Sequence, residues 1–492
     1  MENTGRISRS ISPSARRILF GDNANESIGA ELKYISQVDR AHLVMLSECG
    51  LIESSRATKL LWLIRELEAS GFAPLADKSA VRGLYLLYED YLIERLGTET
   101  GGILHTARSR NDLNATVLLI RLRSPYLKLL REASRLLAVL LRRARCFAGT
   151  VMPAYTHYQA AVPITYGHYL AGIASALARD INGVLETGVD LSRCPLGAGA
   201  VGGTSFPIHT GRTAELLGFE ASVAHSIDAV ASRDFILRLL SGATILGVTL
   251  SRLATDLLTW TTAEFGFLEL PDQLVGSSSM MPQKRNPFLL EHVQGRSSSA
   301  LGAFVSAATA MHAKPFTNSI SVGTEAVSHV WPALQNITEA ALLARLVVSG
   351  AKPIPEAMLE RAERGYITAT EFANRLVTCQ GMPFRNAHHT VGALISEAIE
   401  NHDSLPQVIA QWQGAGDCAS SFAGLDSESV ARSSVHGGGP GDASLRSCLQ
   451  ILQSEWGRLT RARREQEDRW TTAEKALRAA VSDLASKPNG NG

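Results

Sequence analysis

The sequence predicts an all-α protein organised around long, packed helices. No proline occurs between Pro207 and Pro271, and from Ile227 to Leu258 apolar residues recur at helical spacing. A helix over 227–258 is about 45 Å long at 1.5 Å per residue. The stretch 228–252 carries few charges, so we expect much of its circumference to be buried. No alternating strand pattern recurs, so neither a Rossmann fold nor a barrel is supported.

Two further long helices are expected, at about 286–311 and 327–348, and long apolar helices joined by loops indicate a bundle. The chain has 492 residues, of which 45% are hydrophobic, which is ample for a large core. Length alone suggests two to four domains.

The bulk composition excludes several classes of function. With 48 basic and 47 acidic residues the net charge is +1, so nothing indicates nucleic-acid binding. The six cysteines are scattered and form no CxxC pair, which argues against a disulfide scaffold or a zinc site and favours a reducing compartment. We see no apolar run long and charge-free enough to span a bilayer, and therefore expect no membrane partner.

Both ends of the chain differ from the rest. Residues 1–17 contain four arginines, four serines and one acid, which loosely fits an organelle transit peptide. A disordered tail is the interpretation we favour, because no amphipathic apolar face is evident. Residues 486–492 are also expected to be disordered. A cytoplasmic location follows as the default, with the transit peptide as the alternative.

Four separate segments combine polar residues with glycine or proline, where function tends to lie. The first is HTARSRND, residues 105–112, whose hydroxyl, amide and guanidinium donors suit a carboxylate clamp. The alternative is a helix N-cap at Ser109 or Asn111 with solvated arginines, which is the more common meaning of such a segment taken alone.

The second and third segments are weaker signals. His157 lies among polar, turn-forming residues and could transfer a proton, although a lone histidine is more often structural. Residues 195–204 satisfy G-x-G-x-x-G, but we predict no strand before them and no βαβ unit around them. We therefore reject dinucleotide binding and predict a tight loop that needs glycine conformations.

The fourth segment, residues 276–287, holds three serines, two basic residues and no acid, and Glu291 and His292 follow it. Such a loop can present hydroxyls, amides and an ammonium group to a carboxylate whose charge grows during a reaction. A flexible Ser/Gly linker is the alternative, which Lys284, Pro282 and Pro287 make less convincing. The pair His388–His389 lacks acidic or cysteine partners nearby, so we predict no metal site there.

Together these segments resemble the argininosuccinate lyase family of the fumarase/aspartase superfamily. The family motifs HTGRSRND, PGYTHLQxAQPITxGH, PLGSGALAGTxFPI, SxDAVxxRDF and GSSxMPQKKNP correspond to HTARSRND (105–112), PAYTHYQAAVPITYGH (153–168), PLGAGAVGGTSFPI (195–208), SIDAVASRDF (226–235) and SSMMPQKRNP (278–287). The resemblance runs from about residue 30 to 460. It implies a three-domain fold with a long central helical bundle, divided as 1–113, 114–365 and 366–492. It also implies a homotetramer in which each active site uses three chains.

The resemblance carries roles to individual residues. Ser278, six residues before Lys284, would remove the Cβ proton of an aspartate adduct, with Ser279 as a second candidate. The groups implied to bind carboxylates are Ser109, Arg110, Asn111, Thr156, Lys284 and Asn286. His157 and Glu291 would form a histidine–acid pair. Clustered donors around the reacting carboxylate contribute roughly 2–4 kcal/mol each to catalysis, and neither a cofactor nor a metal is required.

The departures from the family lie on the amine side of the reaction. In the segment 317–327, Asn318 stands where family members have a tyrosine, Gly323 where they have a glutamine and Ala326 where they have a lysine, and those three contact substrate. The family's EDIHxxxE reads RGLYLLYE here, with Tyr85 at the histidine. Its FNASIxxD is not recognisable in residues 23–31.

The residues implied to form fumarate thus match the family, whereas those implied to bind the guanidinium portion of the substrate differ from it. An arginine leaving group needs acids or carbonyls that match its planar fork. Our leading hypothesis is a carbon–nitrogen lyase that converts an N-substituted L-aspartate into fumarate and a different amine. The alternatives are a true argininosuccinate lyase with a relocated guanidinium site, and an inactive structural protein like the lens crystallins of this family.

Overall fold

The computed structural model describes residues 11–20, 28–76, 78 and 83–486 of the chain. Expectations for residues 1–10, 23–27 and 487–492 lie outside the described part. The predicted disordered tail is wrong for residues 13–17, because helix α1 (Pro13–Phe20) begins there. Ser12 accepts a hydrogen bond from the Ala15 amide at 3.3 Å, and Pro13 takes the first helical position, which together make a helix start. At the other end, Ser486 is still helical.

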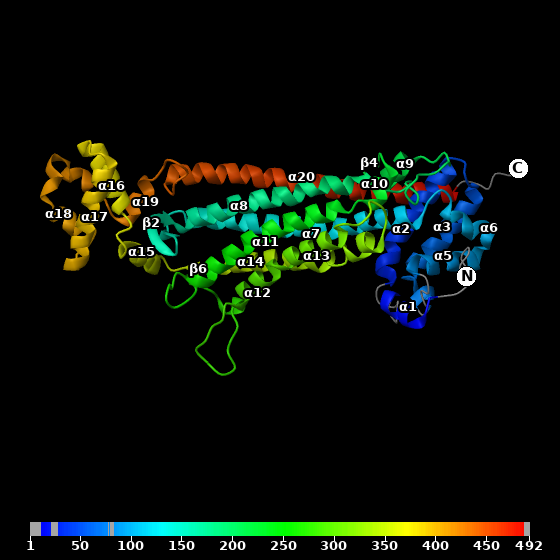
Figure 1. Ribbon diagram of the computed structural model, residues 1–492, viewed down its shortest axis with the longest axis horizontal. Helices are drawn as coiled ribbons and strands as arrows, with labels where there is room; N and C mark the ends of the chain where they lie inside the picture. Colours follow the sequence, from blue (N-terminus) through cyan, green and yellow to red (C-terminus); the bar gives the residue numbers. More distant parts are fainter. Residues whose placement is uncertain (1–10, 21–27, 77, 79–82, 487–492) are drawn as a thin grey trace.

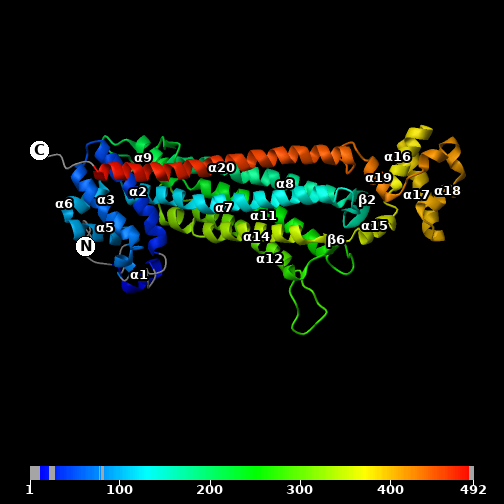
Figure 2. The same cartoon turned by 180° about the vertical axis from the view of Figure 1, so that it is seen from behind.

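Five long helices lie side by side along the molecule (Figure 1), and the view from behind shows the same arrangement (Figure 2). They are α7 (Arg110–Cys146), α8 (Tyr166–Glu186), α11 (Asp234–Trp260), α14 (Val330–Gly350) and α20 (Asp442–Ser486). Two shorter helices, α12 (Phe288–Ser297) and α13 (Ser299–Met311), pack on α11 and α14. The all-α prediction is confirmed.

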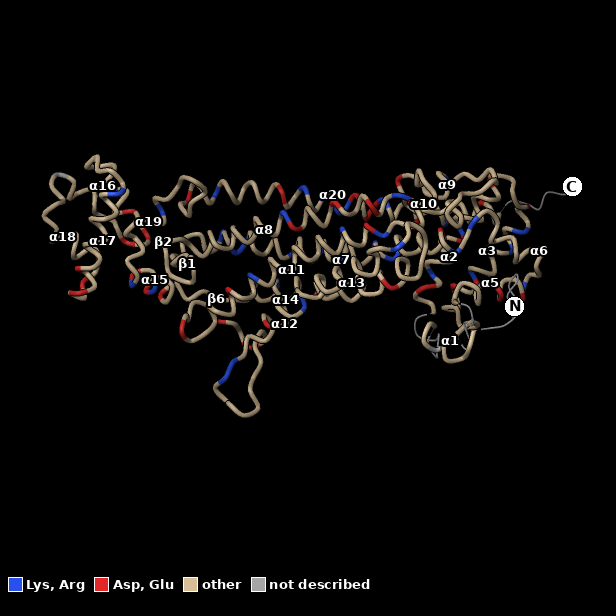
Figure 3. The backbone as a smooth tube through the Cα atoms, in the orientation of Figure 1, with Lys and Arg blue, Asp and Glu red and all other residues tan. Residues whose placement is uncertain are grey.

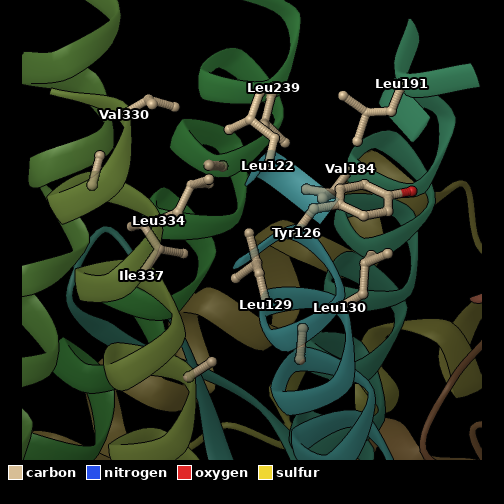
Figure 4. Close-up of a cluster of buried hydrophobic side chains, with 14 of the residues drawn as sticks. Leu122, Tyr126, Leu129, Leu130, Val184, Leu191, Leu239, Val330, Leu334 and Ile337 are labelled. Atoms are coloured by element: carbon tan, nitrogen blue, oxygen red, sulfur yellow. The ribbon is translucent and has the colours of Figure 1, made fainter. Parts of the chain in front are cut away.

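The core runs along the bundle where these helices meet. Figure 4 shows leucines and Tyr126 of α7 against side chains of α8, α11 and α14. Burying each such side chain stabilises the fold by roughly 1.5–3 kcal/mol. At Gly247 of α11 the helices come so close that a Cβ atom would lie 2.5 Å from the Ser297 carbonyl oxygen at the end of α12. A glycine is therefore needed at this crossing.

Two of the three predicted long helices are interrupted. The one expected over 227–258 is α10 (Ser226–Ala231) followed by α11, with Ser232 extended between them. The break is held by the buried Arg233, whose guanidinium donates to the carbonyl groups of Val230 and Ser232. The one expected over 286–311 divides into α12 and α13 at Ser298. The third is α14.

Helix α11 is less buried than its composition predicts. Ile245 and Val248 are 56% and 54% exposed, and on the neighbouring α13 Leu301 and Val305 are 52% and 54% exposed. By length and composition alone α11 could cross a membrane, contrary to the sequence-based expectation. Its packing against α8, α12, α13 and α14 is that of a core helix in a bundle.

The remaining helices gather at the two ends of the bundle, and most of them are shorter (Figure 1). At the N-terminal end lie α2 (Ile28–Glu48), α3 (Ser54–Ala69), α4 (Ala73–Ala76), α5 (Leu84–Leu96), α6 (Thr98–Gly101), the 3-10 turn η1 (Gly102–His105) and α9 (Thr210–Leu216). At the other end lie α15 (Pro355–Glu363), α16 (Ala369–Gln380), α17 (Phe384–Asn401), α18 (Leu405–Gln411), η5 (Gln413–Phe422) and α19 (Ser427–Ser433).

Helices α16 to α18 and η5 enclose a second core around Phe372 and Leu376, separate from that of the bundle. Helix α20 then returns along the bundle and packs on α7, α8, α2 and α3. The residues 442–486, which the predicted C-terminal domain includes, thus pack with the central helices. The division at 113 and 365 stays a prediction.

A disulfide joins Cys379 of α16 to Cys418 of η5, across 39 residues of sequence. The scattered cysteines did not indicate this pair, because the two residues are brought together only by the packing of α16 against η5. The scattered cysteines argue against a disulfide scaffold, and among the described residues this is a single bond rather than such a scaffold. The bond closes a loop within the second core.

The described strands are short. Strands β1 (Val151–Thr156) and β2 (Gln159–Thr165) form an antiparallel hairpin, and β5 (Leu268–Glu269) pairs with β6 (Lys352–Pro353). Strand β3 (Arg193–Cys194) comes directly before the glycine loop and pairs in parallel with β4 (Ala221–Ser222), which follows α9. The expectation that no strand and no βαβ connection surround this loop is thus wrong, although each strand has only two residues.

Candidate active site

The first polar segment forms the start of α7. The Ser109 hydroxyl accepts a hydrogen bond from the Asn111 amide at 3.2 Å, and the Asp112 carboxylate accepts one from the Ser109 amide at 2.9 Å. This is a capping box, so the N-cap interpretation of Ser109 is confirmed. Arg110 is exposed, whereas Arg108 is buried rather than solvated.

Asp112 ties the start of α7 to the glycine loop. Its carboxylate is fully buried and accepts from four backbone amides: Ser109 and Leu113 on one oxygen, and Gly197 and Gly199 on the other, all at 2.9–3.0 Å. Burial raises the pKa of Asp112, and these donors oppose that shift. The amides of Gly197 and Gly199 in the G-x-G motif are thus already paired with a protein carboxylate and are not free to contact a phosphate.

A buried polar network lies directly beneath this segment. The Arg108 guanidinium forms an ion pair with Asp39 of α2 at 2.5 Å, and both side chains are 0% exposed. Arg108 also donates to the Tyr85 hydroxyl of α5 at 3.0 Å, and that hydroxyl donates to Glu89 at 3.1 Å and lies 3.0 Å from Nδ1 of His105. Burial opposes ionisation, but Asp39 and Tyr85 hold the pKa of Arg108 above its usual value.

His42 of α2 fixes the same segment from another side. Its Nε2 lies 2.8 Å from the Thr106 carbonyl oxygen. Burial and the charge of Arg108 lower the pKa of His42 to about 3, so the imidazole is neutral near pH 7. The neutral ring therefore donates its Nε2 proton to Thr106.

Asn111 joins three segments that are distant in sequence. Its amide nitrogen donates to the Ala200 carbonyl of the glycine loop at 3.1 Å. Its amide oxygen accepts from the side chain of Asn318 at 3.0 Å. Asn318 precedes a π-helix, η4 (Ser321–Glu325), a form that often marks functional sites. A Cβ atom on Gly323 would lie 3.3 Å from the Asn318 amide oxygen, whereas Ala326 is buried in the core.

Thr156 and His157 lie on the β1–β2 hairpin at the far end of the bundle. Thr156 pairs with Gln159, so His157 and Tyr158 form a two-residue turn with φ values of 50° and 62°. Neither residue is glycine, so the turn carries backbone strain of roughly 1–3 kcal/mol per residue. Tyr158 is 95% exposed. The hairpin therefore holds His157 outward, with no other part of the described chain covering it.

The serine loop projects away from the bundle between η3 (Asp272–Leu274) and α12 (Figure 1). Its neck is closed by two hydrogen bonds between Gly276 and Asn286, each of 2.8 Å. The Ser278 hydroxyl accepts from the amides of Met280 and Met281 at 3.3 and 3.0 Å. Lys284 is exposed, and the charged part of the loop is basic (Figure 3).

One chain does not bring these segments together. The neck of the serine loop lies at the C-terminal end of α14, where a Cβ atom on Gly350 would touch Leu274, and the hairpin packs on α15 beyond that end. The Asn111–Asn318 pair lies before the N-terminal end of α14, whose 21 residues span roughly 30 Å. Glu291 is exposed in the first turn of α12, and within the described residues no ion pair joins it to His157.

Sequence reasoning missed two groups that organise the clamp. Asp112 follows Ser109 by three residues, which is the spacing of a capping box and could have singled it out. Asp39 has no such signal, because its partner Arg108 lies 69 positions further along the chain, before the start of another helix. Among the described residues, no cluster of three or more His, Cys, Asp or Glu side chains is placed to hold a metal ion.

Comparisons with known proteins identify the family of the chain. Residues 86–302 match the family described as lyase, and residues 366–420 match the argininosuccinate lyase C-terminal family. An argininosuccinate lyase of Shouchella clausii is 34% identical over 398 residues, covering 80% of this chain and 79% of that protein. One from Methanothrix thermoacetophila is 38% identical over 377 residues, covering 76% of each.

Solved structures of related lyases have the same fold. EDDS lyase in complex with formate superposes with a TM-score of 0.85 at 27% identity, covering 97% of this chain and 96% of that chain. A class II fumarase of Schistosoma mansoni has the same fold with a TM-score of 0.69 at 16% identity, covering 83% of this chain and 91% of that chain. The chain therefore belongs to the argininosuccinate lyase family of the fumarase/aspartase superfamily, and it is a carbon–nitrogen lyase that releases fumarate.

Proposed function

We propose that this lyase cleaves an N-substituted L-aspartate by β-elimination, with Ser278 as the base. The observation that carries the assignment is the pair of backbone amides that donate to the Ser278 hydroxyl. A serine alkoxide is normally too basic to form, and donors aimed at its oxygen, with the ammonium of Lys284 in the same loop, favour the ionised form. The loop between its neck residues contains no acid that would oppose this charge.

The reaction balances without any cofactor. Ser278 takes the Cβ proton, the C–H electron pair becomes the new double bond, and the C–N pair leaves with the nitrogen. As the proton departs, negative charge grows on the adjacent carboxylate, and each donor placed there is worth roughly 2–4 kcal/mol. We assign these carboxylate contacts to Ser109, Arg110, Asn111, Thr156, Lys284 and Asn286. The departing nitrogen then takes a proton from His157, held by Glu291, or from a water that His157 orients.

We further propose that the protein is a homotetramer whose active sites are shared between chains. Within one chain the start of α7 and the serine loop lie at opposite ends of α14, roughly 30 Å apart. A loop movement is too small to span that distance, which supports a site in which a second copy supplies one of the two. The exposed apolar side chains of α11 and α13 are what an interface between bundles buries.

The amine is proposed to differ from arginine. Asn318, which replaces a tyrosine of the family, donates to Asn111, and Gly323, which replaces a glutamine, lies beside Asn318. Their position next to Asn111 supports a change in what the clamp binds. Ala326, at the family's lysine, is buried and cannot reach a ligand. The segment 317–327 is left with Glu325 as its one ionisable group. Argininosuccinate stays the second candidate, because the relatives named above are argininosuccinate lyases. Those relatives come from a bacterium and an archaeon, and we propose a cytoplasmic location for this chain as well.

The test is fumarate release by the purified protein. Argininosuccinate is offered first, and fumarate with a panel of amines is then offered in the reverse direction. Ser278→Ala is the blank, and Ser279→Ala is the matched control on the same loop. Release from argininosuccinate that Ser278→Ala abolishes identifies a true argininosuccinate lyase, whereas turnover with another amine alone supports the altered pocket. An active Ser278→Ala enzyme contradicts the base assignment. No turnover with any adduct is the behaviour of an inactive, crystallin-like protein.

A further inference from the structure

The polar network beneath the carboxylate clamp is unusual in how completely it is buried. Asp39 and Arg108 have side chains with 0% exposure, and Tyr85 is 5% exposed. An ion pair in such a place is costly, because desolvation of both charges offsets their attraction. Apolar residues of similar size would stabilise this part of the fold at least as well. A gain in stability alone therefore does not account for the network.

The network connects two helices, α2 and α5, to the short backbone segment that leads into α7. Asp39 lies on α2 and Tyr85 on α5, whereas Arg108 belongs to the segment itself, directly before the N-cap Ser109. The Tyr85 hydroxyl links these side chains, because it accepts a hydrogen bond from Arg108, donates one to Glu89 and lies 3.0 Å from Nδ1 of His105. His105 and Arg108 thus fix both ends of the turn 105–108 that leads into Ser109.

The backbone of this turn needs such support. Ala107 has a φ of 61°, a left-handed conformation that a residue other than glycine adopts only when its surroundings hold it. The flanking side chains that hold it are those of His105 and Arg108, together with His42 on the Thr106 carbonyl. If these contacts are lost, the turn can relax, and the hydroxyl and amide groups of Ser109 and Asn111 move with it.

We infer that Tyr85 is a positioning residue for the substrate-carboxylate clamp and acts through Arg108 and His105 on Ser109 and Asn111. This inference rests on the proposed function, since it assumes that these two residues bind a carboxylate of the substrate. Tyr85 itself touches no substrate atom. Its hydroxyl sets the orientation of the Arg108 fork against Asp39, and the fork sets where α7 begins.

The decisive variant is Tyr85→Phe, which keeps the ring and removes the hydroxyl that links these side chains. One donor of Arg108 and one acceptor of Glu89 then lose a buried partner, and we expect kcat/KM to fall about tenfold to a hundredfold. The loss should come mainly from a higher KM, because the clamp holds a carboxylate in both the ground state and the transition state. Tyr91→Phe, in the same helix, is the matched control: the Tyr91 ring faces Lys78 and Arg95 rather than this network, and its kinetics should equal those of the wild type.

Two further variants separate positioning from folding. Tyr85→His places a hydrogen-bonding ring at the same position and should recover part of the KM that Tyr85→Phe loses. Arg108→Lys keeps the charge beside Asp39 but lacks the fork that reaches both Asp39 and Tyr85, and it should raise KM like Tyr85→Phe. All variants are compared as folded protein, by circular dichroism and by oligomeric state.

The outcomes distinguish this inference from the proposed function. If the wild type turns over an aspartate adduct and Tyr85→Phe has unchanged KM and kcat, the inference is wrong while the lyase assignment stands. If Tyr85→Phe loses thermal stability but keeps its KM, the network is structural and the inference is also wrong. If the wild type shows no turnover with any adduct, the proposed function fails and this inference fails with it.

Discussion

The carboxylate of Asp112 is the most heavily used acceptor at the start of α7, and Asp112→Asn tests what it contributes. The amide is nearly isosteric, but only its oxygen can accept. Two of the four backbone donors therefore lose their partner, namely either Ser109 and Leu113 or Gly197 and Gly199. A hydrogen bond to a charged group is worth about 1.5–3 kcal/mol, which gives a loss of about 3–6 kcal/mol for the pair.

The lower end of that range is the better expectation. Burial raises the pKa of Asp112, so the ionised carboxylate carries a desolvation cost that the neutral amide does not. We therefore expect Asp112→Asn to lower the free energy of unfolding in urea by about 3 kcal/mol. The exposed Asn114→Ala, one residue beyond Leu113, is the control and should change it by less than about 0.5 kcal/mol.

Activity gives a second readout for the same variant. If the amide turns its oxygen toward Ser109 and Leu113, the glycine loop is released, and Asn111 loses the fixed position of the Ala200 carbonyl to which it donates. We expect a higher KM even at temperatures where the variant is folded. An Asp112→Asn protein that unfolds within about 1 kcal/mol of the wild type and keeps its KM would refute the assignment of Asp112 as the organiser of this clamp.

Three further predictions follow from the buried groups. The pKa of His42 is lowered to about 3 in the folded protein, so stability falls as the pH drops below the unfolded value near 6.5, and the loss between pH 7 and pH 5 is about 2 kcal/mol. Urea titrations of His42→Gln, which keeps a donor for Thr106, should show a pH dependence of the free energy of unfolding that is smaller by that amount. An unchanged dependence means that His42 is protonated or not buried in solution. Cys379→Ser removes the bond between Cys379 and Cys418 and should destabilise the second core by up to about 4 kcal/mol. Hydrogen exchange over 366–425 measures the loss, with Cys448→Ser as the control. Equal exchange in both variants, or free thiols at Cys379 and Cys418 in the oxidised wild type, contradicts the pairing. Gly247→Val places a side chain against the Ser297 carbonyl and should lower the free energy of unfolding, measured by heat or urea, by about 1–3 kcal/mol. The control Gly295→Ala meets open space and should be neutral or slightly stabilising. Equal effects would mean that the α11–α12 crossing is looser than described.

The bundle was predictable because its signal is periodic. The apolar spacing through 227–258 reflects the faces that α11 buries, and that pattern is local to the helix. The interruptions at Ser232 and Ser298 were not predictable in the same way. At the first break the buried Arg233 donates to the carbonyl groups of Val230 and Ser232, and beside the second the Ser297 carbonyl approaches Gly247. Apolar spacing reveals neither feature.

The candidate site was predictable as a set of segments and not as a geometry. HTARSRND and the serine loop stand out because their residue types share one chemistry, that of binding carboxylates. The partners that fix them, Asp39 and Tyr85, lie on other helices and read as ordinary helix residues. The disulfide was missed for the same reason, since Cys379 and Cys418 meet only after α16 packs on η5.

The placement of the segments also has a consequence for function. The resemblance implies that Ser109, Asn111 and Ser278 meet in a pocket built from three chains. In the fold, each chain keeps Ser109 and Asn111 at one end of α14 and the serine loop at the other. Sequence order carries no information about which copy of the chain fills which part of a site. The length of α14, seen only in the fold, separates the two segments within one chain and supports the proposal that a second copy completes the site.

The most direct test of the account is therefore complementation between two inactive variants. Ser278→Ala and Asn111→Ala are purified separately, dissociated, mixed in equal amounts and reassembled, and fumarate release is measured beside each variant treated alone. If a site takes its Ser278 and its Asn111 from different copies, half of the chains supply each intact residue, and roughly a quarter of the wild-type activity should return. If the mixture stays as inactive as its components while reassembled wild type recovers, both residues act within one chain, and the shared-site account is contradicted.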